Sequence, residues 1–441
     1  LRAGYARLDI LREQKERRIY LKRRFLSAVA FLAALSAFFC GCTGGGREER
    51  EEQNGGSYFV QLDIEPGDLS IDGVSVAGEE YASLMQELET LLNGLEDKIS
   101  LDFAESDVSR INAANAGEQV AVSEETRALL EASASFSRIS GGKFSPAVFP
   151  LTELWGFAPS DEGEYTVSRP EPSADEIARA AALSDLSLYT FGESVEKSEG
   201  GAKLDLGGVA KGYLCDRVVS YILDKYAGSR VDGIVRVSTS NSAYLGTVRE
   251  DGIERGYNVA VENPRRLSTG IAYGLYLVGL SDVSVTTSAD NYRCYVYDGK
   301  IYPHIIDPET GRPADRGIIS VTVVVPNAAH EYPGAFADSL STAGFCMSLT
   351  EAIAFFESLS EEYGIGALIV TKDFKYYSVG DLTVMNRSEY ARYCNEYLGG
   401  DYDLDKIADV FAEGDIDSAT DEIVPDAREL EYIEKLESVL N

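Results

Sequence analysis

The chain has 441 residues, of which 44% are hydrophobic and 10% are aromatic, and this composition argues against disorder as its main state. Its 73 acidic residues outnumber 40 basic ones and give a formal net charge of -33, which disfavours non-specific binding to nucleic acid or to anionic lipids. An anionic substrate would therefore have to be held locally, by backbone amides, a lysine or a divalent cation.

The first 56 residues are expected to be an export signal and a linker. A basic segment ending at Arg24 precedes an apolar run over residues 25–39. This run is shorter than the roughly 20 residues that span a membrane, and it fits a signal peptide. A glycine directly before Cys42 resembles a bacterial lipobox, so residues 1–42 are predicted to be a signal peptide with Cys42 lipidated; a plain secretory signal is the alternative. Residues 43–56 are predicted to be a flexible linker. The signal peptide and the lipid anchor together predict a location on the extracytoplasmic face of the cell membrane.

The body is predicted to run from residue 57 to 385 as one mixed α/β domain with a largely antiparallel sheet and flanking helices. Apolar spacing and capping residues predict helices over 78–98, after Ser106, from Ser123 to Gly141-Gly142, after Ser173, up to about Tyr226, and over 349–362. Short β-branched segments predict strands at 231–237, 257–261, 271–278, 283–287, 320–325 and 367–370. Residues 386–441 form an acidic extension, predicted to be helical and without recognisable chemistry.

Cysteines and histidines outside the lipobox offer little chemistry of their own. The sequence has no Cys-x-x-Cys spacing, which argues against zinc or iron–sulfur binding. Isolated buried thiols are predicted, with disulfides as the alternative for an exported protein. The histidine at 330 is expected to be an incidental surface residue. The four cysteines concerned are Cys215, Cys294, Cys346 and Cys394.

Two short segments suggest phosphate chemistry. Asp338 and Thr342 are four residues apart, so on a helix their side-chain oxygens share one face. A carboxylate and a hydroxyl without nearby cysteines suit Mg2+ better than zinc. Gly207-Gly208 is expected where a strand turns into a helix, which would let backbone amides approach a phosphate, and Lys211 would add a positive charge. The alternatives are a helix cap at Asp338 and an ordinary tight turn at the glycines.

An aromatic segment over residues 144–157 contains Trp155, the only tryptophan of the chain. Core packing explains it, and a wall for a flat ring system is the alternative.

Taken together, these segments resemble the FAD:protein FMN transferases, the ApbE family. Members attach FMN to a serine or threonine of a target protein, using FAD as donor and releasing AMP. The resemblance therefore implies FAD as substrate, Mg2+ as cofactor and an exported acceptor protein as partner. The motifs that carry it follow the family's order and are Ser106–Asn112, Gly141–Phe157, Asp205–Tyr213, Thr287-Ser288, His304–Pro313 and Asp338–Thr342.

The resemblance also implies roles for single residues. Asp338 and Thr342 match Mg2+ ligands, with the Gly208 carbonyl at the position of a backbone ligand. His304 is the candidate general base, because a neutral imidazole is available at neutral pH. The positions that match FAD contacts are Lys143, Phe144, Ser145, Asp205, Lys211 and Ile306.

The chain also departs from the family pattern. Thr239-Ser240 stand where the family has paired glycines, Ala289 stands where glycine is usual, and Asp102 stands where a tyrosine is expected. Two rival hypotheses stay open, and the altered glycine strand motivates the second of them. One is Mg2+-dependent hydrolysis of FAD to FMN and AMP, and the other is a non-enzymatic flavin-binding surface lipoprotein.

Overall fold

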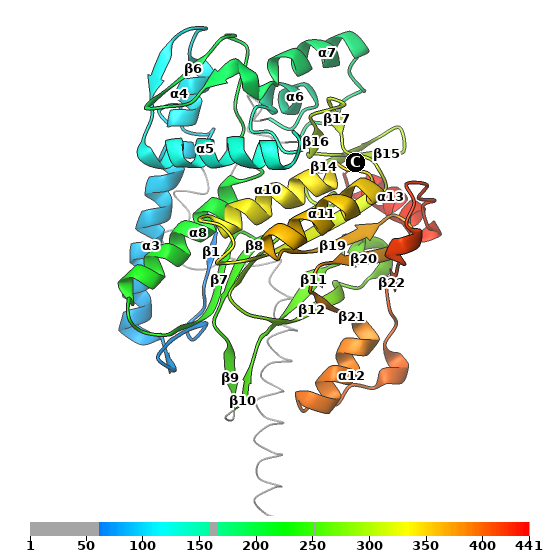
Figure 1. Ribbon diagram of the computed structural model, residues 1–441. Coiled ribbons are helices and arrows are strands. Elements are labelled where there is room, and N and C mark those ends of the chain that lie inside the picture. The colour runs from blue at the N-terminus through cyan, green and yellow to red at the C-terminus, as the bar shows by residue number, and fades with distance from the viewer. Residues whose placement is uncertain (1–60, 159–165, 251–252, 441) are drawn as a thin grey trace, which may run out of the picture. The chain divides into compact units, whose positions relative to one another are not determined.

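The computed structural model describes residues 61–158, 166–250 and 253–440 (Figure 1). The predicted signal peptide, Cys42 and the whole of the predicted linker lie outside these residues. Residues 55–441 form one compact unit. Among the described helices, none combines the length and apolar character that a membrane span requires.

A ten-stranded sheet forms the centre of the described residues. Its strand pairs are antiparallel except for one parallel pair, which joins β20 to β22. This confirms the predicted mixed α/β class with a largely antiparallel sheet. In order across the sheet the strands are β22 (Ala412–Glu413), β20 (Lys375–Val379), β19 (Gly366–Thr371), β18 (Ile318–Pro326), β13 (Val283–Ala289), β8 (Asn241–Leu245), β7 (Val231–Val237), β2 (Leu69–Ile71) and β3 (Val74–Ser75), and β1 (Leu62–Asp63) also pairs with β7.

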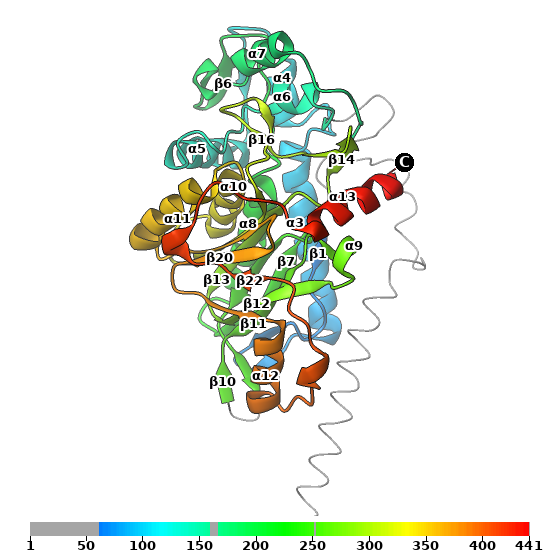
Figure 2. The same cartoon turned by 90° about the vertical axis from the view of Figure 1, so that its right-hand side faces the viewer.

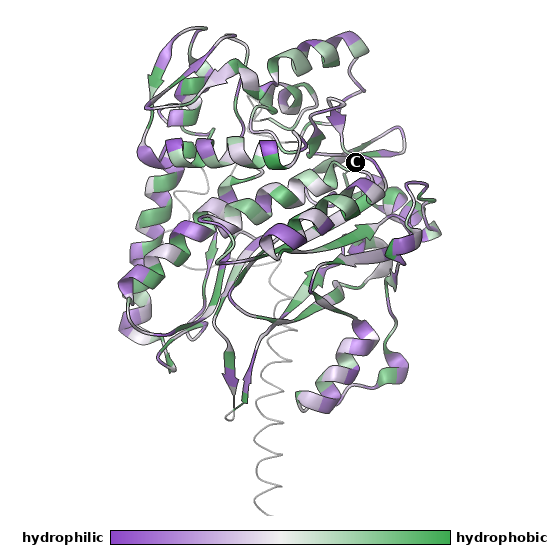
Figure 3. Cartoon of the chain, in the orientation of Figure 1, coloured by the Kyte–Doolittle hydropathy of each residue, from purple (hydrophilic) through white to green (hydrophobic). Residues whose placement is uncertain are grey.

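The two faces of this sheet are covered differently (Figure 1, Figure 2). Helices α8 (Ala210–Lys225), α10 (Pro333–Phe345) and α11 (Leu349–Tyr363) pack on one face, and α3 (Gly78–Ile99) packs on α8. The three-stranded sheet of β11 (Tyr257–Glu262), β12 (Tyr273–Leu280) and β21 (Thr383–Asn386) contributes to the core on the other face. Because side chains alternate along a strand, β18 sends Val321, Val323 and Val325 to the helical side and Val324 to the other. The central strands are accordingly coloured hydrophobic in Figure 3.

Smaller elements surround this core. Helix α5 (Glu124–Ile139) packs on α10 and α3. The other elements of this part of the chain are α4 (Asp107–Ala113), α6 (Phe149–Leu154), α7 (Ala174–Leu183) and the sheet β4 (Gln119–Ala121), β6 (Ser194–Lys197) and β5 (Tyr189–Thr190). Three hairpins are β9 (Val248–Glu250) with β10 (Ile253–Arg255), β14 (Cys294–Tyr297) with β15 (Lys300–Pro303), and β16 (Ile306–Asp307) with β17 (Arg312–Pro313). The remaining helices of the described residues are α9 (Arg266–Thr269), α12 (Arg387–Tyr397) and α13 (Ala427–Leu440), with 3-10 turns at Leu186–Leu188, Leu404–Lys406 and Ile416–Ser418.

Local signals account for the helix starts. The side chains of Ser106, Ser123 and Ser173 each accept a hydrogen bond from a backbone N–H in the first turn of the following helix, as predicted. At Ser173 the reciprocal bond from its backbone N–H to Glu176 completes a capping box. Helix α5 ends before Gly141, whose φ of +62° is the left-handed conformation that glycine tolerates.

The thiols behave as predicted, whereas His330 does not. All four cysteines of the described residues are free and buried. His330 is half-buried, and its ring lies 5.1 Å from that of Phe136 and 5.2 Å from that of Phe336. Its Nδ1 also accepts a hydrogen bond from the Tyr332 N–H. The prediction of an incidental surface residue was wrong, because aromatic side chains from α5 and α10 pack against this ring.

Candidate functional site

Helices α8 and α10 touch backbone to backbone, and this contact builds the site. A Cβ atom at Gly212 would lie 2.1 Å from the Gly334 carbonyl oxygen, so only glycine fits there. The Asp216 carboxylate accepts hydrogen bonds from the N–H groups of Gly334 at 2.7 Å and Ala335 at 2.8 Å, which holds the first turn of α10 against α8. Burial raises the pKa of Asp216 to about 8 against these hydrogen bonds, and the nearby Asp338 carboxylate adds to the rise. Sequence reasoning missed this glycine pair.

This crossing places the predicted metal ligands beside the start of α8. The Asp338 side chain is only 4% exposed, and its Oδ2 lies 3.7 Å from Lys211 Nζ and accepts the Gly212 N–H at 3.1 Å. A Cβ at Gly208 would lie 3.2 Å from Thr342 Oγ1, so the bend reaches this hydroxyl closely. The structure therefore brings Gly208, Lys211, Asp338 and Thr342 together.

The segment before this bend is not the strand that we expected. Residues 202–206 form no strand ladder. The Asn112 side chain holds them instead, donating to the Leu204 carbonyl at 2.9 Å and accepting the Leu204 N–H at 2.7 Å. The Asp205 N–H donates to the Pro146 carbonyl at 2.7 Å, and Asp205 Oδ1 accepts the Gly207 N–H at 2.8 Å. Side-chain hydrogen bonds thus replace a strand in positioning the glycines.

Several backbone amides of the bend are engaged within the protein, and phosphate binding by the backbone at Gly207-Gly208 stays a prediction. The N–H groups of Val209 and Ala210 both donate to the Leu206 carbonyl, and the Gly212 N–H donates to Asp338. Along residues 209–212, phosphate binding would consequently depend on the Lys211 ammonium and a cation rather than on these amides. Lys211 Nζ is held by the Gly207 carbonyl at 2.7 Å.

A group of hydroxyls adjoins Thr342. Ser288 on β13 lies with its Oγ 2.8 Å from Ser341 Oγ and 3.5 Å from Thr342 Oγ1. Thr287 is bonded across the sheet to Thr322, with 2.9 Å between the hydroxyl oxygens. The Thr287-Ser288 motif was a sequence signal for this part of the site. It did not reveal that Ser288, rather than Thr287, lies beside the predicted metal ligand Thr342.

The donor set fits a hard divalent cation better than a transition metal. No group of three or more His, Cys, Asp or Glu side chains that could hold a metal occurs in the described part of the chain. Burial raises the pKa of Asp338 even though the Lys211 charge opposes this rise. The surrounding protein therefore does not fully offset the cost of burying the negative charge of this carboxylate. One buried carboxylate beside a hydroxyl matches the way Mg2+ is held, with one or two carboxylates completed by water and phosphate oxygens.

His304 lies in the short connection between β15 and β16. Its Nδ1 is 3.0 Å from the Arg293 carbonyl oxygen, which can only accept, so Nδ1 carries the proton and Nε2 carries the lone pair in the neutral ring. Burial lowers the pKa of His304 to about 3, and the charges of Arg293 and Lys211 add to this effect. The Lys211 charge acts to lower the pKa of both Asp338 and His304. The predicted metal ligand and the predicted general base therefore lie within range of the same ammonium group.

The remaining predicted FAD-contacting residues lie close to the bend or to the His304 loop. The Phe144 ring lies against Gly208, 3.2 Å from the place of a Cβ there. Ser145 Oγ accepts the Ala147 N–H at 3.2 Å. Lys143 is buried, and its Nζ lies 2.5 Å from a Glu309 oxygen and 3.7 Å from one of Glu351.

Ile306 is buried, and its carbonyl faces the Cys346 sulfur at 3.7 Å. It thereby links the His304 loop to the end of α10.

The aromatic segment serves core packing. Trp155 is fully buried, and its Nε1–H donates to the Gly311 carbonyl at 2.8 Å. Its ring stacks on that of Tyr302 with 5.7 Å between centroids, and Tyr302 stacks in turn on Tyr295. These rings support the hairpin that leads into His304.

The departure from the family's paired glycines lies next to this site. Residues 238–240 form the turn between β7 and β8, and Ser238 adopts a φ of +61°. The Ser240 carbonyl accepts the Thr287 N–H at 3.1 Å, which fixes the turn beside the strand that carries Ser288. The turn that contains Thr239 and Ser240 therefore lies beside the end of β13 that carries Thr287 and Ser288.

A family model described as the ApbE family matches residues 63–369. The chain belongs to the ApbE family. The FAD:protein FMN transferase of Treponema pallidum is 31% identical over 304 residues, which cover 67% of this chain and 79% of that protein. The flavin transferase ApbE from Vibrio cholerae has a TM-score of 0.56 and 26% identity, covering 73% of this chain and 92% of that structure. The ApbE protein from Thermotoga maritima has a TM-score of 0.58 and 28% identity, covering 75% and 96%.

These matches confirm the family resemblance and the fold class. The roles of the single residues in the site stay predictions.

Proposed function

We propose that this chain is a Mg2+-dependent FAD:protein FMN transferase, which moves FMN from FAD to a serine or threonine hydroxyl of an exported protein and releases AMP. Family membership and the activity named for its relatives support this proposal. The observation that carries it is the meeting of Asp338 and Thr342 with Lys211 and Gly208 at the crossing of α8 and α10.

The residues around the bend would bind and orient the pyrophosphate of FAD. Asp338, Thr342 and the Gly208 carbonyl would hold Mg2+, which when bound neutralises phosphate charge and polarises the phosphorus under attack. Lys211 reaches into the same place and is held there by the Gly207 carbonyl. Its ammonium would contact the phosphate oxygens without first having to be ordered.

His304 would accept the proton of the incoming hydroxyl. The hydroxyl oxygen forms a bond to the FMN phosphorus, the bond from that phosphorus to the oxygen of the AMP phosphate breaks, and AMP leaves. Nε2 takes the proton, since Nδ1 is engaged with Arg293. A low pKa keeps the ring neutral but makes it a weak base. The negative charge of the bound pyrophosphate would offset Lys211 and Arg293 and strengthen it.

The test is an incubation of residues 57–441 with FAD, Mg2+ and an exported flavoprotein acceptor. Fluorescent acceptor on a denaturing gel is the expected result. Free FMN and AMP without labelled protein would instead indicate hydrolysis, and unchanged FAD would indicate a non-enzymatic flavin-binding protein. Asp338→Ala should abolish labelling, and Glu361→Gln, an exposed carboxylate on the neighbouring helix α11, is the matched control that should not.

We also propose a lipid anchor on Cys42 at the extracytoplasmic face of the cell membrane. The basic segment, the apolar run and the Gly41-Cys42 pair support it. In cells fed a labelled fatty acid, the full chain should carry label and sediment with membranes. Cys42→Ala should lose both properties, and a labelled Cys42→Ala chain would refute the assignment.

A further inference from the structure

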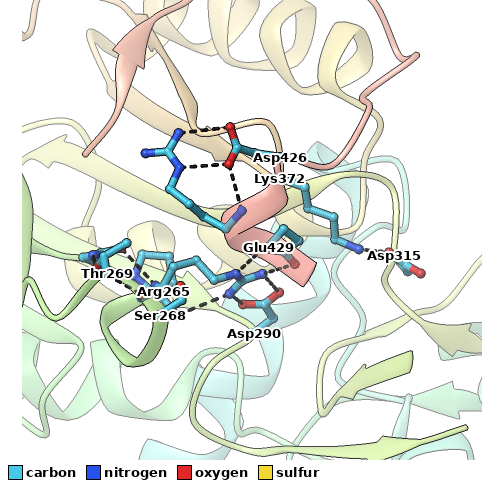
Figure 4. Close-up of polar contacts among 11 residues, drawn as sticks. Arg265, Ser268, Thr269, Asp290, Asp315, Lys372, Asp426 and Glu429 are labelled. Carbon is cyan, nitrogen blue, oxygen red and sulfur yellow. Dashed lines mark hydrogen bonds and ion pairs between the residues drawn. The ribbon is translucent and has the colours of Figure 1, made fainter. Parts of the chain in front are cut away.

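The acidic C-terminal extension contributes a fully buried charge to the body. Glu429 on α13 has a side chain only 1% exposed, and Arg265, which precedes α9, is 0% exposed. The Arg265 guanidinium donates to both carboxylate oxygens of Glu429, with 2.9 Å from Nη2 to Oε1. Figure 4 shows these contacts. Residue 429 lies well beyond residue 369, where the family match ends.

The other side of Arg265 reaches the active-site region. Its Nη1 and Nη2 donate to the Asp290 carboxylate at 2.6 and 2.8 Å, so one guanidinium joins two buried carboxylates. Asp290 directly follows β13, which carries Ser288 beside Thr342. It also precedes Arg293, whose carbonyl orients His304.

The same helix covers the hairpin that leads to His304. Tyr432 and Leu436 of α13 are buried against Cys294 and Ile301 of β14 and β15. The Tyr432 ring also lies under the Arg265 guanidinium, 4.3 Å from its carbon to the ring centroid.

A second tie lies at the far end of the same segment. Lys372 forms an ion pair with Asp315, which follows β17. The backbone carbonyl of Lys372 accepts a hydrogen bond at 3.0 Å from the N–H of Asp426, which directly precedes α13. The segment from Asp290 to Asp315, which contains His304, is therefore tied at both ends to residues that contact the C-terminal extension (Figure 4).

We propose that α13 is a positioning element of the active site, in which Glu429 acts through Arg265 and Asp290 to hold the segment between Ser288 and His304. This inference rests on the proposed function. A buried guanidinium between two carboxylates has one geometry that satisfies its donors, so it fixes where the chain leaves β13. Removing one carboxylate leaves that exit point less restrained.

The experiment compares Glu429→Gln with the wild-type full chain. FMN transfer should lose at least tenfold in kcat while the KM for FAD changes less than twofold, because His304 acts on the acceptor hydroxyl. Hydrogen exchange of the amides in residues 290–304 should accelerate at least tenfold, and exchange in α10 should change less than twofold. Glu434→Gln, an exposed residue of the same helix, is the matched control and should equal the wild type.

A merely structural role predicts a different result, in which the melting temperature falls but kcat and exchange in 290–304 stay at wild-type values; that result would overturn the proposal. Leu436→Ala loosens the same helix without disturbing buried charge, and it should show the same pattern more weakly if Glu429→Gln does not fold. The exchange measurement does not need activity. If the wild type transfers no FMN, the proposed function fails while the exchange data still decide whether α13 holds the hairpin.

Discussion

The contact between α8 and α10 at Gly212 can be tested with a single methyl group. In Gly212→Ala the new Cβ would lie 2.1 Å from the Gly334 carbonyl oxygen, whereas ordinary contact begins at 3.4 Å. The helices would have to separate by about 1.3 Å, the difference between these distances. We expect overpacking to cost about 1–3 kcal/mol in the free energy of unfolding.

The effect on function should be larger than the effect on stability. Lys211 and Gly208 move with α8, while Asp338 and Thr342 move with α10, so separation of the helices divides the site. A misplacement of about 1 Å in a catalytic constellation costs about 100-fold in rate. We therefore expect FMN transfer to fall about 100-fold in a variant that still unfolds cooperatively.

The assay is FMN transfer to the acceptor at saturating Mg2+, beside urea denaturation. Gly94→Ala is the matched control, because Gly94 lies in α3 with no atom within 4 Å of an added Cβ. It should gain about 0.5–1 kcal/mol and keep full activity. A Gly212→Ala variant with wild-type transfer would refute the claim that this backbone contact assembles the site.

Single substitutions test the predicted metal ligand, the candidate base and the buried tryptophan in turn. Asp338→Asn keeps the shape of a buried side chain but removes its charge, so Mg2+ titration should no longer stimulate FMN transfer; full stimulation would contradict the metal assignment. Because burial lowers the pKa of His304 to about 3, only the unfolded chain carries a proton on this imidazole between about pH 3 and pH 6.5. The free energy of unfolding therefore falls as the pH is lowered through that range. His304→Gln should reduce this slope, by up to about 1.4 kcal/mol per pH unit in urea denaturation, and an unchanged slope would count against a neutral His304 ring in the folded chain. Trp155→Phe leaves the Gly311 carbonyl without its donor and should cost about 1–3 kcal/mol in the free energy of unfolding. A smaller loss would show that this hydrogen bond does not stabilise the loop around Gly311.

Elements with strong local signals were predictable. The helix predicted over 349–362 is α11, Leu349–Tyr363, because a capping serine precedes it and Gly364 adopts a left-handed φ of +67° after it. The strand predicted over 231–237 is β7 with the same bounds. Such signals act between neighbouring residues, so no knowledge of the fold is needed to read them.

The predictions that failed concern long-range packing. The segment before Gly207 was expected to be a strand, but Asn112, from a distant helix, holds it through paired hydrogen bonds. His330 was expected on the surface, but it is half-buried and its ring packs against Phe136 of α5 and Phe336 of α10. Neither Asn112 nor Phe136 could be identified as a partner from the residues around these positions.

The sequence alone determined which side chains could carry the chemistry. The spacing of Asp338 and Thr342 puts two oxygen ligands on one helical face, since a helix repeats about every four residues. Only the tertiary structure decided what meets that face: Gly212 against Gly334, Lys211 beside Asp338, and Glu429 linked to Asp290 through Arg265. The physical reason is that periodicity and capping are local, whereas a site is completed by residues far apart in the chain that only packing of the core brings within contact distance.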